Sequence, residues 1–401
     1  MHNIYNRNYL KALILLLGLV FLQGCATVRS PSAVPPELIY KARVPNASNI
    51  RVVINYLNPE STIAQFKDAQ YQLTKESLSK KDIYILAVSG GGADGAFGAG
   101  LLCGWTETGK RPQFDVVTGV STGALIGPFA FLGPEYDHIL KTTYTTSCDK
   151  DIFHKKSLMS LVFGRADALS STRPLAEMLN DLITAEFLQK VAQEHAKGRR
   201  FFVATTQLDA QRPVIWNMGL IASIGTPKAL ELFRTVLLAS AAIPVAFPPV
   251  HIQVEADGTQ YDELHVDGGV STQVFGYFFT PGTEITSHIY VIRNDKLAND
   301  PKEVELKLSS IATRSLSMLT TIQGVNDLIR IYNFSKDDYD DYNLAYIPQD
   351  FSAPRKGNFD PNYMKKLFEV GFEKAKSQQP WDKTPPIVNF DEIARQTVKG
   401  E

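Results

Sequence analysis

The feature that most constrains this chain is a serine that lies between two glycines at the end of an apolar run. Residues 116–123 read VVTGVSTG, and Val116 and Val117 have the β-branched side chains typical of a buried strand. Gly119, Ser121 and Gly123 form the pattern GxSxG, which lets a strand turn sharply into a helix with the serine hydroxyl exposed at the turn. An ordinary glycine-rich turn with a capping serine has the same pattern. The serine is a nucleophile only if the chain also supplies a base and an oxyanion site.

Further apolar runs predict strands that alternate with helices. The predicted strands are 83–89, 114–120, 201–208, 213–218 and 289–294, and the predicted helices include 172–182 and 228–242. This alternation is typical of an α/β fold with a mostly parallel sheet covered on both faces. Beyond about residue 300 the pattern changes to long helical stretches, which form either a C-terminal helical extension or part of the same domain. Their apolar part, 310–323, is compatible with a lid, an interface or core, and core is the favoured interpretation.

The N-terminus has the pattern of an export signal. Arg7 and Lys11 precede the apolar run 12–22, which is too short to span a bilayer and suits a secretory signal. The run ends in LQGC, and this resembles the lipobox of bacterial lipoproteins, in which cleavage leaves a lipidated cysteine at the mature N-terminus. We therefore expect a signal peptide over 1–24 and lipidation of Cys25. The alternative is a plain secretory signal with an incidental cysteine.

Composition restricts the function classes. Removing residues 1–24, which hold two basic residues and no acidic one, leaves 39 basic and 42 acidic residues, so no nucleic-acid partner is expected. Cys103 and Cys148 are the other two cysteines, and one pair is no disulfide framework. We expect Cys103 to be a free thiol in a buried helix. The sequence has no CxxC or histidine-rich spacing, so it predicts no metal site and no cofactor.

A glycine-rich loop follows the first predicted strand. Residues 89–100 read SGGGADGAFGAG, in which Gly90, Gly91 and Gly92 follow the strand and Gly95 opens a helix. Backbone N–H groups that converge near a helix N-terminus can bind an oxyanion or a phosphate. The loop lacks the lysine of a phosphate-binding P-loop, which disfavours a nucleotide. The glycines could also serve only close helix packing.

The base is less obvious from the residues alone. His288 follows the serine in an order that suits a Ser, Asp, His hydrolase, although a histidine at a strand start is more often structural. The other candidate is Asp267 in VDGG, which is followed by Gly268 and Gly269. Asp before Gly is also common turn chemistry, so either interpretation stands at this point.

Together, GGGxxG, GxSxG and DGG in this order on an α/β pattern resemble the patatin-like phospholipase family over roughly residues 83–275. Residues 240–250 (SAAIPVAFPPV) resemble the segment before the family's aspartate, and residues 205–217 resemble its bacterial lipoprotein members. The resemblance implies a three-layer α/β/α fold and a Ser–Asp dyad without histidine. It assigns Ser121 as the nucleophile, Asp267 as the proton acceptor and the amides of Gly90, Gly91 and Gly92 as oxyanion donors. One departure is Asp94, where many members have Arg or Lys; the carboxylate could also cap the helix or face solvent.

We therefore expect a lipid-anchored acyl hydrolase in the bacterial cell envelope, at the outer membrane because Ala26 rather than Asp follows Cys25. Its expected partners are membrane lipids, with phospholipid as the favoured substrate and the oligomeric state open. The expected domains are 25–80, a tether (26–36) and N-terminal segment; 81–300, the catalytic domain; and 301–401, the C-terminal helical extension. A catalytically silent binding lipoprotein and a serine peptidase are the alternatives.

Overall fold

The computed structural model describes residues 29–47, 49–70, 80–155, 168–276, 285–335 and 341–385. The predicted signal peptide, 1–24, and the predicted lipidation site, Cys25, lie outside these described residues. Within the described ranges, none of the helices combines the length and apolar character that a bilayer crossing requires.

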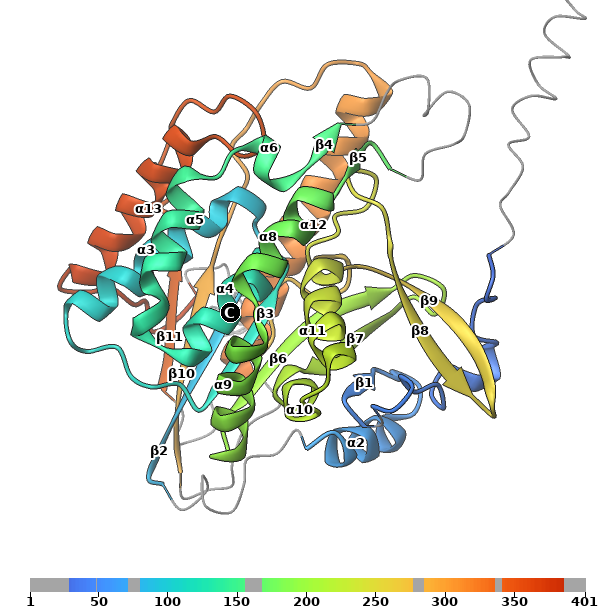
Figure 1. Ribbon diagram of the computed structural model, residues 1–401. Coiled ribbons are helices and arrows are strands. Elements are labelled where there is room, and N and C mark those ends of the chain that lie inside the picture. The colour runs from blue at the N-terminus through green and yellow to red at the C-terminus, as the bar shows by residue number, and fades with distance from the viewer. Residues whose placement is uncertain are drawn as a thin grey trace, which may run out of the picture.

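The described residues include a nine-stranded sheet at the centre of the molecule (Figure 1). Its main path runs β1-β7-β6-β3-β2-β10-β11, and the hairpin of β8 and β9 joins it at β6. The five consecutive strands β6, β3, β2, β10 and β11 are parallel to one another. The strands are β1 (Arg51–Val53), β2 (Asp82–Val88), β3 (Val116–Val120), β6 (Arg200–Gln207), β7 (Arg212–Asn217), β8 (Val250–Ala256), β9 (Thr259–Asp267), β10 (Thr286–Arg293) and β11 (Asp341–Tyr346), with β4 (His154–Lys155) and β5 (Ser170–Ser171) in a separate pair.

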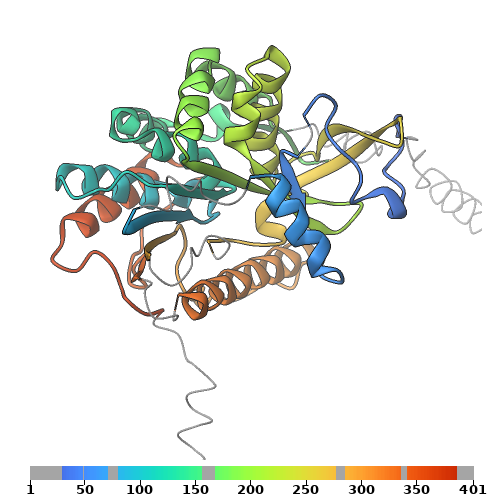
Figure 2. The ribbon, with the colours of Figure 1, turned by 90° about the horizontal axis from the view of Figure 1, so that it is seen from below.

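Helices cover both faces of this sheet, which gives the three-layer α/β/α architecture (Figure 2). One face carries most of them, whereas α12 and α2 lie on the other. The helices are α2 (Pro59–Asp68), α3 (Gly95–Glu107), α4 (Thr122–Leu132), α5 (Asp137–Thr146), α6 (Asp149–Ile152), α8 (Arg173–Leu182), α9 (Ala185–Ala196), α10 (Met218–Ser223), α11 (Pro227–Ser240), α12 (Leu308–Phe334) and α13 (Pro361–Lys376). The predicted fold class is therefore confirmed.

The near-continuous apolar sequence of β2 follows from this layering. Ile83, Ile85 and Ala87 belong to the core on the α12 face, whereas Leu86 and Val88 belong to the core on the opposite face. Because successive side chains of a strand point to opposite faces, both sets must be apolar when both faces are buried. The strands predicted at 83–89, 114–120, 201–208, 213–218 and 289–294 correspond to β2, β3, β6, β7 and β10.

The small residues of α3 allow α13 to approach it closely. A Cβ at Gly100 would meet the backbone of Phe368, and one at Gly104 would meet the backbone of Phe372. Cys103 lies in the same helix as a buried free thiol, as predicted, and Cys148 is free as well. Helix α13, which lies after residue 300 in the sequence, thus packs against α3 of the predicted catalytic domain.

The sheet itself also continues past residue 300. Strand β11 pairs in parallel with β10, from His288 opposite Asp341 to Arg293 opposite Tyr346. The C-terminal residues therefore supply helices α12 and α13 and one edge strand. The domain boundary at 300 stays a prediction.

The favoured interpretation of 310–323 as core is wrong. Ile311, Leu316, Met318, Leu319 and Ile322 are all exposed, while α12 packs on the sheet through the later residues Leu328 and Ile331. Apolar composition alone cannot tell a helix that is covered from one that projects past its sheet.

The described part of the predicted tether is fastened to the body. Arg29 pairs with Asp209, the carbonyl of Ser32 accepts a hydrogen bond from the Asp262 amide, and Arg43 forms a β-bridge with Glu255. Residues 29–47 therefore lie along the hairpin of β8 and β9, which the apolar pattern of the sequence did not predict.

Candidate active site

Ser121 occupies a sharp turn between β3 and α4, as the GxSxG pattern predicts. Its backbone has φ 54° and ψ −123°, a conformation that residues other than glycine rarely adopt. The flanking glycines are required by packing: a Cβ at Gly119 would meet Gly123 and Ala124, and one at Gly123 would meet the carbonyl of Val88 in β2. The turn is therefore strained and tightly seated, which is typical of functional sites.

The register of β6 explains how Ser121 meets Asp267. Strand β3 ends at Val120 opposite Ala204 of β6, and β9 pairs with β6 from the next position, Thr205, which lies opposite Asp267. Strand β9 thus takes over the same edge of β6 at the point where β3 stops. The end of β9 and the residue that follows β3 are brought together in this way.

The Ser121 hydroxyl donates a hydrogen bond of 2.6 Å to Oδ2 of Asp267. Oδ1 of the same carboxylate accepts a 2.7 Å hydrogen bond from the Gly269 amide, and the Asp267 amide donates to the carbonyl of Ala242 at 2.9 Å. Both side chains are buried. Each carboxylate oxygen of Asp267 thus accepts a hydrogen bond, Oδ2 from the Ser121 hydroxyl and Oδ1 from the Gly269 amide.

The environment gives Asp267 the pKa of a useful base. Burial raises the pKa of Asp267 to about 7, although the hydrogen bonds from Ser121 and the Gly269 amide lower it. Desolvation destabilises the charged form, so the carboxylate becomes a stronger proton acceptor than an exposed aspartate. A base works best with a pKa near the operating pH.

The glycine loop lies against the serine, but its three amides are not equivalent. A Cβ at Gly90 would lie 3.2 Å from Cβ of Ser121, so the two backbones are adjacent. The Gly90 amide donates to the carbonyl of Gln273 at 3.1 Å and is therefore engaged. Among the described residues, the Gly91 and Gly92 amides have no such acceptor. Of the three predicted oxyanion donors, Gly91 and Gly92 are therefore the candidates whose amides have no backbone acceptor among the described residues.

The remaining motif glycines are sites of close approach. A Cβ at Gly95 would meet Thr122 and Tyr144, one at Gly268 would meet the carbonyl of Ala204, and one at Gly269 would meet Gln273. They bring the glycine loop and the turn after Asp267 close to their neighbours.

Two residues that the sequence did not single out position this site. The hydroxyl of Ser240 accepts a 3.0 Å hydrogen bond from the Ser121 amide and donates one of 2.7 Å to the carbonyl of Ala204. Gln273 accepts from the Gly90 amide and donates from Nε2 to the carbonyl of Gly269 at 2.7 Å. Ser240 begins the segment SAAIPVAFPPV, so the resemblance marked its neighbourhood without assigning its role.

Asp94 neither caps a helix nor faces open solvent. Its carboxylate makes no capping hydrogen bond at the start of α3 and pairs with Arg355 at 3.4 Å. Burial raises the pKa of Asp94 to about 6, although Arg355 and a hydrogen bond with Tyr363 lower it. The negative charge beside the glycine loop is thus compensated by a cation from the C-terminal region.

An apolar pocket begins at Ser121 and Gly92. Its lining includes Leu125, Phe129, Leu179, Phe247 and Met364. The cavity of about 60 Å³ is far smaller than the roughly 300 Å³ or more of ordinary ligand sites, so a long chain enters only if lining side chains move. Met178 and Met364, which both line the pocket, have the flexible side chains that such movement needs.

No described histidine serves the site. His288 lies at the start of β10, where its ring pairs with Asp82 and Asp341. This position is at the amino ends of the parallel strands, whereas Ser121 lies at their carboxyl ends. His265 is buried against Glu263 and Thr205, and burial lowers its pKa. Among the described residues, neither Ser121 nor Asp267 has a histidine partner.

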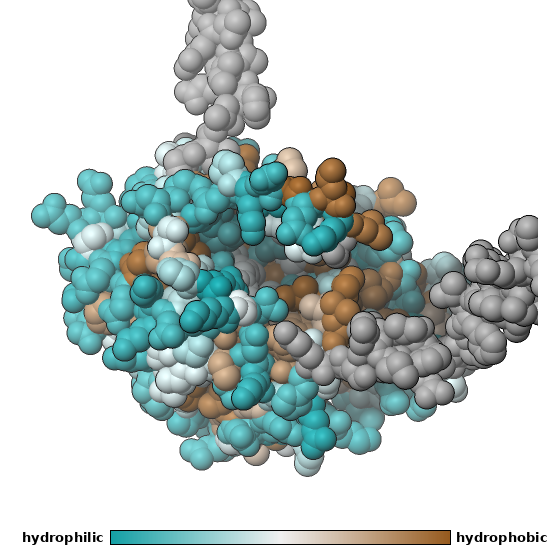
Figure 3. All heavy atoms as spheres, turned by 90° about the horizontal axis from the view of Figure 1, so that it is seen from above, coloured by the Kyte–Doolittle hydropathy of each residue, from teal (hydrophilic) through white to brown (hydrophobic). Residues whose placement is uncertain are grey.

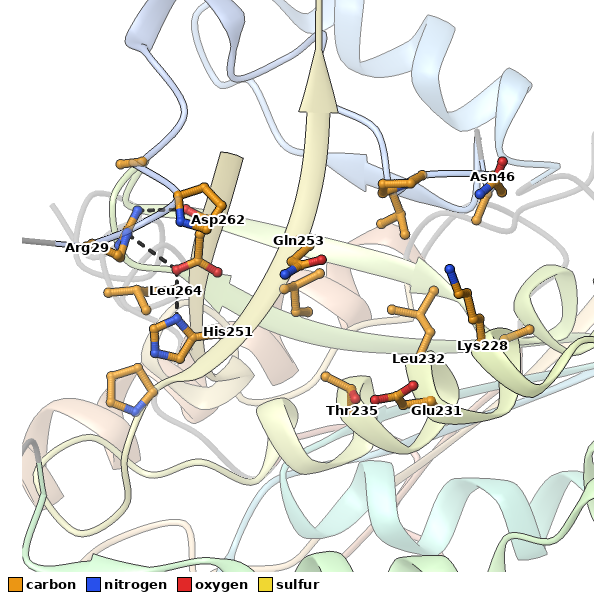
Figure 4. Close-up of a pocket in the computed structure, with 18 of the residues that line it drawn as sticks. Arg29, Asn46, Lys228, Glu231, Leu232, Thr235, His251, Gln253, Asp262 and Leu264 are labelled. Carbon is orange, nitrogen blue, oxygen red and sulfur yellow. Dashed lines mark hydrogen bonds and ion pairs between the residues drawn. The ribbon is translucent and has the colours of Figure 1, made fainter. Parts of the chain in front are cut away.

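A second cavity, of about 1480 Å³, lies between α11, the hairpin of β8 and β9, and residues 29–47 (Figure 4). Its labelled side chains include Arg29, His251 and Asp262, which form one ion-pair cluster. None of the predicted site residues lines it. The described ranges also contain no group of His, Cys, Asp or Glu side chains that could hold a metal ion.

Residues 86–275 match the family model described as patatin-like phospholipase. A search of curated proteins finds no match. Among solved structures, the chain is similar to VipD from Legionella pneumophila, with 14% sequence identity, a TM-score of 0.32, and coverage of 74% of this chain and 66% of that chain. The chain thus spans just under two thirds of the VipD chain.

Proposed function

We propose that this chain, whose residues 86–275 match the patatin-like phospholipase family model, hydrolyses acyl esters of membrane lipids with Ser121 as nucleophile and Asp267 as its base. The observation that carries this proposal is the 2.6 Å hydrogen bond from the Ser121 hydroxyl to a buried carboxylate. Lipid acyl hydrolysis is the activity of the family. The dyad and the substrate are our proposal.

The first half of the reaction forms an acyl-enzyme. Oγ of Ser121 attacks the ester carbonyl carbon while its proton passes to Oδ2 of Asp267. The Gly91 and Gly92 amides donate to the tetrahedral oxyanion, and collapse of this intermediate breaks the bond to the alcohol. Asp267 returns the proton to the leaving alcohol oxygen, so the carboxylate is regenerated.

The second half of the reaction releases the fatty acid. A water molecule attacks the acyl-enzyme carbonyl and gives a proton to Asp267, and collapse breaks the bond to Ser121. The proton then returns to Oγ of Ser121. The apolar pocket beside Ser121 would hold the acyl chain throughout, which makes an ester of a fatty acid the substrate that fits best.

We also propose that Cys25 is lipidated and anchors the protein in the bacterial cell envelope, at the outer membrane. The support is the sequence LQGC after a short apolar run, with Ala26 after the cysteine. Several acyl chains on one residue give stable anchoring, and an anchor raises the concentration of the enzyme near lipid substrates.

A fluorophosphonate probe tests the nucleophile directly, because it forms a bond only with an activated serine. We expect the full chain to be labelled at Ser121 and the Ser121→Ala variant to stay unlabelled. The protein should turn over a soluble fatty-acid ester and leave peptides intact. A folded protein that resists labelling and cleaves no ester would instead support the silent binding lipoprotein.

A further inference from the structure

The first half of α12 presents an apolar stripe that nothing in the described chain covers. Residues 308–323 include a single charged side chain, Arg314. Leu308 is 85% exposed, Leu319 66% and Met318 58%. At about 100° per residue, all of the exposed apolar residues fall within an arc of roughly 160°. They are Leu308, Ile311, Leu316, Met318, Leu319 and Ile322.

This stripe faces away from the sheet. Leu328 and Ile331 pack the second half of α12 onto the sheet core. On the same helical wheel Leu328 lies roughly 160° and Ile331 roughly 140° from the centre of the stripe. The exposed residues are therefore not the continuation of the core-facing side.

The stripe also projects beyond the edge of the sheet where Ser121 lies. The carboxylate of Asp327 accepts hydrogen bonds from the Gln273 amide at 2.7 Å and the Thr272 hydroxyl at 3.2 Å, just after the turn that follows Asp267. From Asp327 back to Leu308 the helix rises by roughly 28 Å. Figure 1 shows α12 extending past the carboxyl ends of the strands.

A second apolar group lies at the catalytic pocket. Val245 is 69% exposed and has φ 70°, which is an outlier for a β-branched residue. Its carbonyl accepts a 2.9 Å hydrogen bond from the amide of Leu169, which is 49% exposed. Ile243 and Phe247, on either side of Val245, line the pocket. The strained loop thus turns one apolar side chain outward at the pocket.

A view onto this end of the molecule shows hydrophobic residues gathered around a hollow (Figure 3). The described chain begins beside the hairpin of β8 and β9, at the right-hand flank of the molecule in Figure 1. Arg29 pairs with Asp209, which follows the carboxyl end of β6, and β6 runs parallel to the strand that ends at Ser121. Only residues 26–28 separate Arg29 from Cys25, a stretch of at most about 14 Å. A lipid on Cys25 would therefore hold this flank close to the bilayer.

We propose that the apolar stripe of α12, together with Leu169 and Val245, is a docking surface that inserts into the headgroup region of a lipid bilayer. An amphipathic helix of this kind buries its apolar face by about 5–10 Å at the interface. The bilayer is the occupant that fits, because the stripe projects at the end of the molecule that carries the pocket for a lipid acyl chain, and the proposed anchor would hold the β8–β9 flank at the same bilayer. This inference rests on the proposed function, since docking delivers the substrate to Ser121.

Binding is tested apart from catalysis. The full chain with Cys25→Ser and Ser121→Ala has neither a lipid anchor nor a nucleophile, and it is sedimented with vesicles of phosphatidylethanolamine and phosphatidylglycerol. Adding Leu308→Ser, Met318→Ser and Leu319→Ser should lower the bound fraction at least about tenfold. The control is Leu57→Ser with Ile63→Ser, which removes exposed apolar residues at α2 and should leave binding unchanged.

Equal binding of the parent and the α12 variant would overturn the docking surface. So would a parent that sediments as a dimer and an α12 variant that sediments as a monomer, because the stripe would then be a self-interface. In the background with Ser121 restored, the α12 variant should lose hydrolysis of vesicle lipid about tenfold and keep hydrolysis of a soluble ester. If the background with Ser121 restored and an unaltered α12 cleaves neither substrate, the proposed function fails, while the sedimentation result still decides the docking surface.

Discussion

The hydroxyl of Ser121 lies 2.6 Å from Oδ2 of Asp267, although 146 positions separate the two residues in the sequence. This contact depends on the register of β6, in which Ala204 is paired with the end of β3 and the adjacent Thr205 with the end of β9. The proposed nucleophile and its proposed base are thus held by neighbouring positions of one buried strand. Sites built on strands hold such geometry more precisely than sites built on loops.

The proposed base predicts the pH dependence of catalysis. Because burial raises the pKa of Asp267 to about 7, only the ionised form above this pH can accept the proton of Ser121. We expect kcat/KM for a soluble ester to rise about tenfold per pH unit below pH 7 and to level off above it. Stopped-flow or steady-state assays from about pH 5 to 9 measure this. A profile with its midpoint near 4 would mean that Asp267 is not the base.

The same shift predicts a cost in stability. The folded-state pKa of Asp267 lies above that of the unfolded chain, so its contribution to stability is present at low pH and is lost as the pH rises from about 4 through 7. Asp267→Asn removes the buried charge. We expect the variant to be inactive and, at pH 8, more stable than the wild type by on the order of 1 kcal/mol or more. Urea denaturation at low and high pH measures the difference, which should vanish near pH 4.

Ser240 should be a positioning residue. Ser240→Ala leaves the Ser121 amide and the Ala204 carbonyl without their hydroxyl partner, at a cost of about 1–3 kcal/mol in unfolding free energy. We expect kcat to fall by roughly tenfold or more with little change in KM, because the turn that holds Ser121 shifts. Ser287→Ala is the matched control, since the Ser287 hydroxyl is buried and has no hydrogen-bond partner among the described residues. Equal kcat for the two variants would exclude the role of Ser240.

The buried ion pair between Glu263 of β9 and Arg51 of β1 should stabilise the fold. Glu263 is buried with both carboxylate oxygens on Arg51 of β1, and His265 contacts one of them at 3.0 Å. Burial would raise the pKa of Glu263, but Arg51 and His265 hold it at about 2. Glu263→Gln leaves Arg51 as an unpaired buried charge and should cost roughly 3–5 kcal/mol in urea denaturation. The exposed Glu303→Gln should cost nothing measurable; comparable losses in both would contradict the pairing.

The predicted anchor has its own test. Cys25→Ser should move the protein from the membrane fraction of the producing bacterium to the soluble fraction, and the mass of the wild type should include the acyl chains. A wild type that is soluble and has the mass of the unmodified chain would rule out lipidation.

Local chemistry made much of this site predictable. GxSxG marks a sharp turn after a strand, and near-continuous apolar runs mark the parallel strands buried on both faces, so Ser121 and β2 could be identified from their own neighbourhoods. The sequence favours Asp267 over His288 only through the family resemblance. The hairpin of β8 and β9 could not be identified from its own neighbourhood. Asp262 and Glu263 are buried polar residues that pair with Arg29 and Arg51 from distant segments, and His265 is buried against Glu263.

Long-range contacts also explain what the sequence left open in the glycine loop and α12. The Gly90 amide is engaged by Gln273, which the fold brings from the far side of the serine motif. The apolar residues of 310–323 have the composition of a core helix, but they are exposed because this part of α12 extends past the end of the sheet. Neither fact is encoded in the neighbouring residues.

The most direct test of the central claim is the release of fatty acid from phospholipid vesicles by the purified mature protein, beside Ser121→Ala and Asp267→Asn at matched folding. We predict release by the wild type and background rates for both variants. Sustained release by a folded Asp267→Asn variant, or equal release by all three proteins, would contradict catalysis by Ser121 and Asp267.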